Sequence, residues 1–479
     1  MRDFRKLQAG IKSRPVSRRS LVRGATVAGM TASLGAYAAR AQEATPATPV
    51  MTTPTVDISG TSLSILQWQH FVPVWDAWFD VFVDEWEAAT GVTVTVDRVN
   101  TADIPAAFAA EIEAQQGHDI VEHIASLPQY EEAVLDMTDL VAEATARHGA
   151  QLDMCMRNSY NPTTNKFYGF THGYAPDPAN YRKSLWTEVG FDDGPATFDE
   201  LLSGGTQIFT DQGVQMGIGM SQEIDSNMAA QAMIWAFGGS VQDENENITI
   251  NSPETLAAVE FMKELFESCM TPEVFSWNAA SNNQLLVAGQ ASYILNSISA
   301  YRTAQEQQPE TADDIFLSLP LVGPGGDERA LAHGHAVFTA MIPTYAANPD
   351  AAREFLLHLT ANYQAVVDES LFYNFPAFPD TYPELTQDGG PLDEDPYGSN
   401  PPDKLSVLKT ANDWTVNLGW PGPANAMIGE AFNTFVLSDM MALAARGDMT
   451  PADSIAQAEA TLNEIAQNWR DEGLMGGGE

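Results

Sequence analysis

The chain has 479 residues, with 64 Asp and Glu against 23 Lys and Arg, so its formal net charge at pH 7 is −41. Such a charge repels the phosphates of nucleic acids and the headgroups of anionic lipids, which argues against a nucleic-acid partner. The length exceeds what one hydrophobic core usually holds, so we expect two domains.

The N-terminal residues have the pattern of an export signal. Arg18 and Arg19 precede a short, mildly apolar run at residues 24–39, which ends in Ala39-Arg40-Ala41. This order is typical of a cleaved signal peptide, and the paired arginines indicate the twin-arginine route. The run is shorter than the ~20 apolar residues that span a bilayer, which disfavours a membrane anchor. We expect a signal peptide at residues 1–41 and a disordered leader at residues 42–57. The mature protein would lie in the periplasm or at the extracellular face of the cytoplasmic membrane.

Strands and helices alternate through the first part of the mature chain. In the helix predicted at residues 74–90, Trp75, Trp78 and Trp86 recur at helical spacing, so we assign them to the core. Repeated strand-helix-strand units predict a mainly parallel sheet, in which ligands bind beyond the carboxyl ends of the strands. The patterns predict strands at residues 62–66, 92–96 and 118–123 and a second helix at residues 104–115.

A further α/β unit begins near Tyr168. A strand at residues 168–175 precedes a helix at residues 181–189, which Gly190 ends. Thr197 and Glu200 form the reciprocal pattern of a capping box at the start of the next helix. Beyond it we expect a strand at residues 214–220, a helix at residues 228–237 and two short strands around a polar turn within residues 241–250.

The later part of the chain is mostly helical. Ser252 caps a helix that Pro253 opens, and Asn348 caps the helix that follows it at Pro349. The buried face of the first of these helices should carry Leu256, Val259, Met262, Leu265 and Phe266. Residues 373–423 are rich in Pro, Asp and Gly, so we expect them to loop over the surface. Helices return at residues 424–446 and 451–469.

Several segments stand in the order of a known family signature. The first is YRKSLW at residues 181–186, followed by VGF at residues 189–191 and PATFDEL at residues 195–201. The others are GGS with an acidic turn and NSPE at residues 238–254, LLVAGQASYILNS at residues 285–297, and NPDAAREFL at residues 348–356. Together they resemble the family 1 extracellular solute-binding proteins, the sugar-capturing components of ABC importers. Arg182 stands where that family usually has Asn or Asp.

The resemblance implies a two-lobed α/β periplasmic-binding-protein fold, type II-like, with a ligand cleft between the lobes. Each lobe would be a mainly parallel sheet flanked by helices. Lobe 1 would comprise residues 58–173 plus 335–375, and lobe 2 residues 174–334 plus 376–479. The lobes would close by hinge bending near Tyr174, His333 and Phe375. The resemblance also implies a carbohydrate ligand, ABC permease transmembrane subunits as partners and no catalytic residues, and we expect a monomer without a cofactor.

A sugar site should combine aromatic rings, which stack on C–H faces, with polar side chains, which pair with hydroxyls. Trp68, Trp277 and Trp420 have polar or Pro/Gly neighbours, which favours stacking over core packing. For Trp235, in an apolar helix, core packing is equally expected. We predict that Trp420→Ala weakens sugar binding and leaves folding intact. The candidate ligand-binding residues are Trp68, His70, Gln129, Tyr130, Tyr174, Asp177, Trp235, Trp277, Asn278, Asn296, His333, His335 and Trp420.

Two other function classes stay open. The charge and the many carboxylates suit a binder of a cationic solute such as a polyamine or iron. A secreted glycoside hydrolase would need two carboxylates facing each other across a sugar, and acidic residues are too frequent here to locate such a pair. The sequence has no G-x-S-x-G or H-E-x-x-H motif.

Three patterns could hold a metal ion, but each has a simpler interpretation. His333 and His335 flank Gly334, and H-x-H without a third ligand favours a hydrogen-bonding or hinge role. Asp243, Asn245 and Asn247 have the spacing of calcium ligands but lack the glycine and glutamate of a calcium loop, so a hairpin turn is preferred. Asp393-Glu394-Asp395 is expected to be a solvated acidic loop. We therefore expect no metal in the site.

Two further expectations concern stability. Cys155 and Cys269 are the only cysteines, and they either pair in an oxidising compartment or remain buried thiols. The acidic surface should repel itself in dilute buffer, whereas the Debye length falls to ~3 Å at about 1 M salt. We expect thermal stability to rise with added NaCl.

Overall fold

The computed structural model describes residues 47–324 and 332–478 of the chain. The predicted signal peptide and the first residues of the predicted leader lie outside the described residues. Residues 47–57 of that leader run along α13 (Pro349–Ala361) and α14 (Tyr363–Glu369). The backbone N–H of Val50 donates to Asn362 Oδ1 at 2.5 Å, and that of Thr55 donates to Glu354 Oε1 at 2.8 Å. This part of the leader is therefore hydrogen-bonded to the first lobe.

A seven-stranded sheet with the order β11-β6-β10-β3-β1-β2, in which β12 pairs with β10, forms the centre of the first lobe. β1 is parallel to β2 and β3, as predicted, but β10 is antiparallel to β3 and β6. The sheet is mixed because β10 returns from the second half of the chain in the opposite direction. The strands are β1 (Ser62–Trp68), β2 (Thr93–Val99), β3 (Ile120–His123), β6 (Phe170–Pro176), β10 (Ala332–Met341), β11 (Phe375–Pro376) and β12 (Thr415–Val416).

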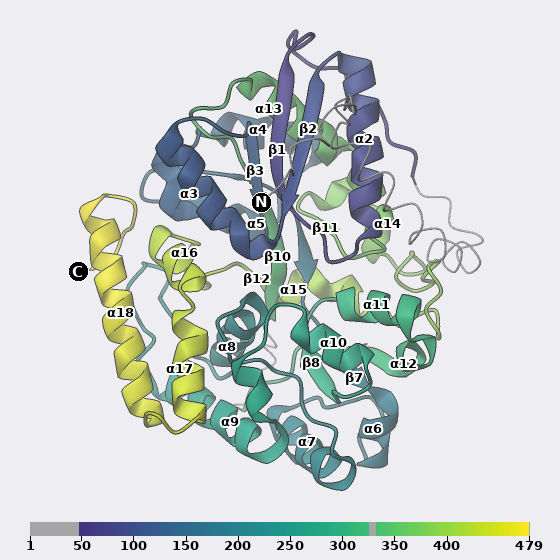
Figure 1. The fold of residues 1–479 in the computed structure, drawn as a ribbon, viewed down its shortest axis with the longest axis vertical. Coiled ribbons are helices and arrows are strands. Elements are labelled where there is room, and N and C mark those ends of the chain that lie inside the picture. The colour runs from purple at the N-terminus through teal and green to yellow at the C-terminus, as the bar shows by residue number, and fades with distance from the viewer. Residues whose placement is uncertain (1–46, 325–331, 479) are drawn as a thin grey trace, which may run out of the picture. The chain divides into compact units, whose positions relative to one another are not determined.

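Apolar helix faces pack on this sheet. α2 (Val74–Thr90) has the predicted bounds and buries Trp75, Phe79, Phe82 and Trp86, while Trp78 is half-buried. The Phe82 ring stacks on His358 of α13 with 4.7 Å between ring centroids. The same lobe holds α3 (Ile104–Ala114), α4 (Thr138–His148) and α5 (Asp153–Arg157) (Figure 1). It also holds a small hairpin of β4 (Tyr160–Asn161) and β5 (Lys166–Phe167).

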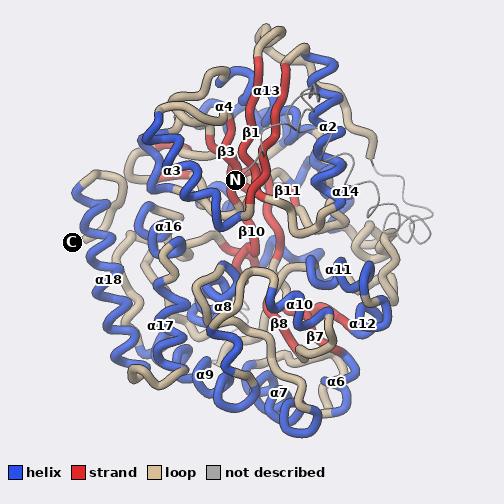
Figure 2. The backbone as a smooth tube through the Cα atoms, viewed as in Figure 1, coloured by secondary structure: helices blue, strands red, loops and turns tan. Residues whose placement is uncertain are grey.

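The second lobe has a three-stranded sheet of β8 (Tyr293–Leu295), β7 (Ala179–Arg182) and β9 (Ile315–Ser318). Both of its pairings are antiparallel, so the mainly parallel sheet expected here is not observed. Buried apolar residues such as Trp186, Met233 and Val259 form one core cluster with the helices, which surround the short strands in Figure 2. The helices are α6 (Lys183–Glu188), α7 (Phe198–Gln212), α8 (Ile224–Ala236), α9 (Pro253–Cys269), α10 (Ser281–Val287), α11 (Ser299–Gln307), α12 (Pro309–Asp314), α15 (Ala411–Trp414), α16 (Ala426–Asn433), α17 (Val436–Ala445) and α18 (Pro451–Asp471).

Local capping chemistry was predicted well, with one exception. Thr197 and Glu200 form the expected capping box at α7, and Ser252 accepts from the backbone N–H of Thr255 at α9. Asn348 precedes α13 but does not cap it with its side chain, which donates to Ser62 Oγ at 3.2 Å instead. Here a tertiary contact has replaced the local one.

Four expected elements differ from the structure. Tyr181 belongs to β7 and not to a helix, because it pairs with strands on both sides. Residues 214–220 form no strand beyond a single bridge at Gln215, and residues 241–250 form only a bridge between Gln242 and Ile248. The helix expected at residues 424–446 is broken into α16 and α17 at Phe435.

The segment at residues 373–423, which we expected to loop over the surface, alternates between buried stretches and exposed turns. Phe378, Leu405 and Trp414 lie in the interior, and short 3-10 turns satisfy the backbone between them. Asp395, expected in a solvated loop, is 5% exposed, and Arg302 Nη1 pairs with its Oδ2 at 2.7 Å. Composition failed for the buried stretches because it does not show which apolar residues between the exposed turns pack into the interior.

The two cysteines and the polar turn have simple roles. Cys155 and Cys269 are both free and buried, so they are thiols and not a disulfide. Asp243 accepts hydrogen bonds from the backbone of Asn245 and Asn247, which makes the acidic pattern a tight turn. Across the part of the chain that the structure describes, no helix is both long and apolar enough to cross a membrane.

Candidate functional site

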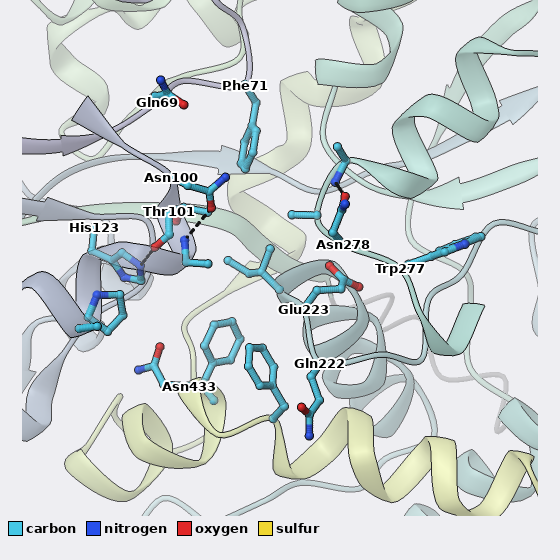
Figure 3. A pocket seen from close by; sticks show the side chains of 18 of the residues that line it. Gln69, Phe71, Asn100, Thr101, His123, Gln222, Glu223, Trp277, Asn278 and Asn433 are labelled. Atoms are coloured by element: carbon cyan, nitrogen blue, oxygen red, sulfur yellow. Dashed lines mark hydrogen bonds between the residues drawn. The ribbon is translucent and has the colours of Figure 1, made fainter. Parts of the chain in front are cut away.

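A cavity of about 760 Å³ opens between the strand ends of the large sheet and helix starts of the second lobe (Figure 3). We define the sheet wall as the lining residues Gln69, His70, Phe71, Asn100, Thr101, Ala102, Pro105, Ala106 and His123. We define the helix wall as Gln222, Glu223, Ile224, Trp277, Asn278, Ala279, Ala280, Phe432, Asn433 and Phe435.

The sheet wall follows the carboxyl ends of β1, β2 and β3. The backbone N–H of Gln69 donates to the carbonyl of Val99 at 2.9 Å, which extends the β1–β2 pairing into the cavity. Asn100 Oδ1 accepts from the N–H of Ala102 at 3.0 Å and so turns the chain into α3. Parallel strands in register bring these ends to one edge, where ligands of α/β sheets bind.

His123, at the end of β3, closes the base of this wall. Its Nε2 lies 3.2 Å from the carbonyl of Thr101 and its Nδ1 lies 2.8 Å from that of Ala125. Burial lowers the pKa of His123, although both backbone contacts and the Glu122 charge oppose the shift. A neutral imidazole carries a proton on only one ring nitrogen, and the shorter contact indicates that Nδ1–H donates to the carbonyl of Ala125.

Glu223 organises the start of α8 in the helix wall. Its Oε2 accepts from the N–H of Asp225 at 2.7 Å, and its Oε1 accepts from the N–H of Ser226 at 2.5 Å and from the Ser226 hydroxyl. A carboxylate at this end of a helix is stabilised by the free N–H groups and the helix dipole. Burial nevertheless raises the pKa of Glu223 above its ordinary value.

A buried polar cluster supports this wall from below. Asp225 Oδ2 accepts from the amides of Asn282 and Asn296, each at 2.9 Å. Burial raises the pKa of Asp225 well above its ordinary value, and the charges of Glu223 and Asp177 add to the shift. Asn296, a predicted ligand residue, is thus placed beneath the cavity, where it bonds to Asp225.

The last part of the helix wall is the break between α16 and α17. Phe435 has φ 60° and ψ 32°, a left-handed conformation that a bulky side chain rarely adopts. Phe432, Asn433 and Phe435 all line the cavity. In a continuous helix Phe432 and Phe435 would share a face but Asn433 would point away from them, so the break is what lets all three reach the cavity.

Among the predicted ligand residues, the structure brings His70, Trp277 and Asn278 to the cavity. Trp277 is half-buried and Asn278 is exposed, so both can meet a solute. His70 is 5% exposed and bonds to Val72 and Asn374 through its ring nitrogens.

The other predicted residues lie away from the described cavity lining. Trp68 is buried and stacks on His70, Tyr174 donates from its hydroxyl to Asn412, and Asp177 is buried in the second lobe. Gln129 and Tyr130 sit in a turn where Tyr130 packs on Phe108, and Trp235 packs edge-to-face on Trp420 at 6.2 Å. His333 and His335 belong to β10, and their side chains lie outside the described part of the chain.

Sequence reasoning missed several lining residues. Asn100 and Thr101 follow β2 and obey the same strand-end rule, but the predicted strand stopped at Val96 because Asp97 and Arg98 interrupt the apolar alternation. Gln69 was passed over between the predicted Trp68 and His70, and Phe71 was passed over next to His70. Phe432, Asn433 and Phe435 gave no signal, because their helical pattern is continuous in the sequence.

The chain belongs to the family of bacterial extracellular solute-binding proteins, since the family model matches residues 73–366, more than half of the chain. It is 23% identical over 187 residues to a Deinococcus radiodurans protein named "Probable ABC transporter-binding protein", which covers 38% of this chain. The match spans 44% of that relative, less than half of its length.

Two solved structures show the fold. An ABC transporter solute-binding protein of Thermotoga lettingae, bound with α-D-tagatose, has a TM-score of 0.70 at 15% identity over 85% of this chain and 100% of that one. An Arthrobacter chlorophenolicus sugar transporter with bound laminaribiose has a TM-score of 0.69 at 16% identity over 84% and 99%. The fold is therefore that of a two-lobed periplasmic binding protein, and both the family and these structures are binding proteins, not enzymes.

Proposed function

We propose that this chain is the extracytoplasmic solute-binding component of an ABC importer, and that its cavity captures a sugar or oligosaccharide for delivery to the membrane permease. The family, the relative's name and the sugars bound in similar structures support this class. The observation that carries the proposal is the chemistry of the cavity lining.

The lining interleaves aromatic rings with uncharged hydrogen-bonding groups. Rings can stack on the C–H faces of a sugar, and amides can both donate to and accept from its hydroxyls. The volume of about 760 Å³ lies within the range of roughly 300–1,000 Å³ that small-molecule sites span. The rings are Phe71, Trp277, Phe432 and Phe435, and the polar groups are Gln69, Asn100, Thr101, Gln222, Asn278 and Asn433.

The same lining argues against a cationic solute. Glu223 is the only carboxylate among the described lining residues, and both of its oxygens accept hydrogen bonds from the start of α8. The strongly negative composition therefore belongs to other parts of the chain. One engaged carboxylate also fails the requirement of a glycoside hydrolase for a facing pair.

A thermal-shift screen tests the proposal, with maltose, laminaribiose and α-D-tagatose as sugars and spermidine and ferric citrate as cationic probes. A solute bound only by the folded state, at about 100 times its Kd, adds about 2.7 kcal/mol of apparent stability. We expect a shift with at least one sugar. A shift with a cation and none with sugars would overturn the proposal, and release of reducing ends would indicate a hydrolase.

We further propose hinge closure at the three crossing segments. Tyr174 on β6 is paired with Phe375 on β11 and with Val337 on β10, so these segments are neighbours in the sheet and can bend together. The proposed lobe bounds remain residues 58–173 plus 335–375 and residues 174–334 plus 376–479. X-ray scattering should show a smaller radius of gyration when sugar is bound.

Export and assembly complete the proposal. Arg18 and Arg19 support twin-arginine export to the periplasm or the outer face of the cytoplasmic membrane, and the protein acts as a monomer. Replacing both arginines with lysine should stop export, and light scattering should give the mass of one chain. A dimer in solution would contradict the second statement.

A further inference from the structure

The loop after β1 supplies the aromatic ring of the sheet wall. In Figure 3 Phe71 projects from this loop into the space between the two walls. Gln69 is exposed and Phe71 is half-buried, whereas His70 between them is 5% exposed. The buried His70 therefore lies between two residues that face the cavity. Contacts that hold His70 in place also set the directions of the Gln69 and Phe71 side chains.

Both ring nitrogens of His70 bond to the protein. Nδ1 accepts from the backbone N–H of Val72 at 2.9 Å, and Nε2 lies 2.9 Å from Asn374 Oδ1. Burial lowers the pKa of His70 to about 4, so the ring is a neutral imidazole whose Nε2–H donates to Asn374. The ring also stacks between Trp68 and Trp75, at 4.9 Å and 4.8 Å. Its polar atoms are thus used inside the protein.

The backbone of His70 is held by a carboxylate. Its N–H lies 3.3 Å from each oxygen of Asp76, in the first turn of α2. α2 has Pro73 at its N-cap and no side chain that caps the helix. The carboxylate of Asp76 in its first turn instead accepts from the backbone of the loop that precedes the helix. The loop and the helix start are thereby joined by one side chain.

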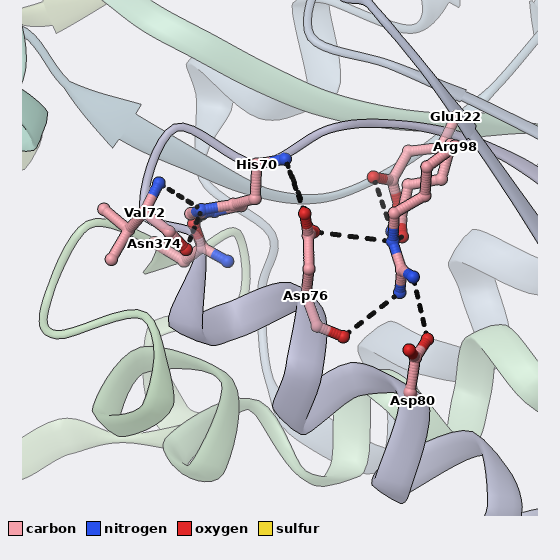
Figure 4. A network of polar contacts seen from close by, with 8 residues as sticks. His70, Val72, Asp76, Asp80, Arg98, Glu122 and Asn374 are labelled. Carbon is pink, nitrogen blue, oxygen red and sulfur yellow. Dashed lines mark hydrogen bonds and ion pairs between the residues drawn. The ribbon is translucent and has the colours of Figure 1, made fainter. Parts of the chain in front are cut away.

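Arg98 of β2 fixes Asp76 in turn. Its Nε lies 3.4 Å from Asp76 Oδ1 and 3.3 Å from Gln67 Oε1, and its Nη1 bonds to the more exposed Asp80 at 2.7 Å (Figure 4). Arg98 is 15% exposed at its side chain, so water screens the Asp76 pair only in part. The chain of contacts runs from β2 through Asp76 to the loop.

We propose that His70, Asp76 and Arg98 are positioning residues for ligand binding, which act through Gln69 and Phe71 and do not touch the solute. The proposal rests on the proposed function, because it assumes that the cavity binds the ligand. It also changes the role of His70 from a ligand contact to the anchor of the loop. Asn374, which precedes β11, links that anchor to a crossing segment.

The groups around Asp76 predict a pH signature. Arg98 faces it from β2, Asp80 from α2, Glu122 from β3 and the His70 backbone from the loop. Burial raises the pKa of Asp76 to about 6, although Arg98 opposes the shift. Protonation below that value removes the charge that attracts Arg98 and weakens the acceptor for His70. His172 bonds to Glu122 and also faces this network, so Asp76→Asn is needed to isolate the Asp76 contribution.

The first experiment needs no ligand. Backbone hydrogen exchange of a peptide covering residues 69–72 should be faster in Asp76→Asn than in the wild type. Asp80→Asn is the matched control, because it removes the more exposed partner of Arg98 on the same helix and leaves the Asp76 contacts in place. Equal exchange in the two variants would overturn the proposal, whether or not any sugar binds.

The second experiment measures affinity by calorimetry with maltose and laminaribiose as probes. Asp76→Asn should weaken binding about tenfold at about pH 7, and Asp80→Asn less than about twofold. Wild-type affinity should fall between about pH 7 and about pH 5, while that of Asp76→Asn stays flat. Asn374→Ala provides a second test should Asp76→Asn fold poorly, and it should weaken binding with an unchanged pH slope. Full affinity in both variants would refute positioning, whereas no binding by the wild type would refute the proposed function alone.

Discussion

The two walls line the same cavity but are held in place by different parts of the fold. The sheet wall continues the register of β1, β2 and β3, in which Leu66 is paired with Val121 and Trp68 with Val99. The helix wall depends on the cap at Glu223, the buried Asp225 cluster and the break at Phe435. The position of the sheet wall follows from the order of the strands, because the wall lies at their ends. The position of the helix wall depends on contacts between segments that are distant in the chain.

The largest expected effect distinguishes Phe71, the ring that lines the sheet wall, from Trp420, the stacking ring that the sequence predicts. Phe71→Ala should weaken sugar binding by about 2 kcal/mol, roughly thirtyfold in Kd, because the ring stands in the sheet wall. Trp420→Ala should change Kd less than about twofold, since Trp420 packs on Trp235 and is outside the described lining. Calorimetry on both variants decides this. A larger loss in Trp420→Ala would restore the platform that the sequence predicts.

The next prediction concerns the unfolding free energy and compares two buried carboxylates, Glu122 behind the sheet wall and Asp225 behind the helix wall. Burial raises the pKa of Glu122, but hydrogen bonds from His172 and Gln67 outweigh it and hold that pKa below its ordinary value of 4.5. Its contribution to stability is therefore present above 4.5 and is lost as the pH falls through the lower value of the folded state. Glu122→Gln should cost about 1.5 kcal/mol of unfolding free energy at about pH 7.

Asp225 should respond in the opposite direction. Its pKa is raised well above the ordinary value by burial and by the charges of Glu223 and Asp177, so its ionisation costs stability in the folded state. Stability from this group should rise as the pH falls through the raised value. Asp225→Asn should therefore cost less than Glu122→Gln at about pH 7 and should flatten the pH dependence towards about pH 5. Urea unfolding at the two pH values measures both effects, and a reversed order would contradict the assignment.

A smaller effect concerns the strained position of the helix wall. Phe435 adopts φ 60°, which glycine adopts without the Cβ clash. Phe435→Gly should be more stable than Phe435→Ala by about 1 kcal/mol, because only glycine relieves the backbone. Both variants should lose sugar affinity equally, since both lack the ring. Equal melting temperatures would show that no strain is stored at the break.

Added salt should produce the smallest of the expected effects. Screening of the net charge of −41 should raise the melting temperature in concentrated NaCl. The sugar Kd should stay within about twofold over the same range, because the lining holds one engaged carboxylate. A melting temperature that does not change with salt would remove the screening argument, and a strongly salt-dependent Kd would favour a charged solute.

The two walls also differ in how far the sequence located them. The strand-end rule pointed to the turn after β1, and it would have reached Asn100 if the predicted strand had continued to Val99. It could not do so from the pattern, because Arg98 is polar yet partly buried by its contacts with Asp76 and Gln67. Nothing in the sequence near Phe435 distinguishes a helix break from a continuous helix.

The sequence by itself determined the elements whose signals are local. The bounds of α2 follow from its aromatic periodicity, and the capping box at Thr197 and the cap at Ser252 follow from side chains that meet neighbouring backbone groups. Only the tertiary structure decided that His70 is buried and bonded to Val72 and Asn374, that Phe378, Leu405 and Trp414 lie in the interior, and that Phe432 and Phe435 line the cavity. The physical reason is that burial and partner choice depend on segments far apart in the chain, so they cannot be read from either segment alone.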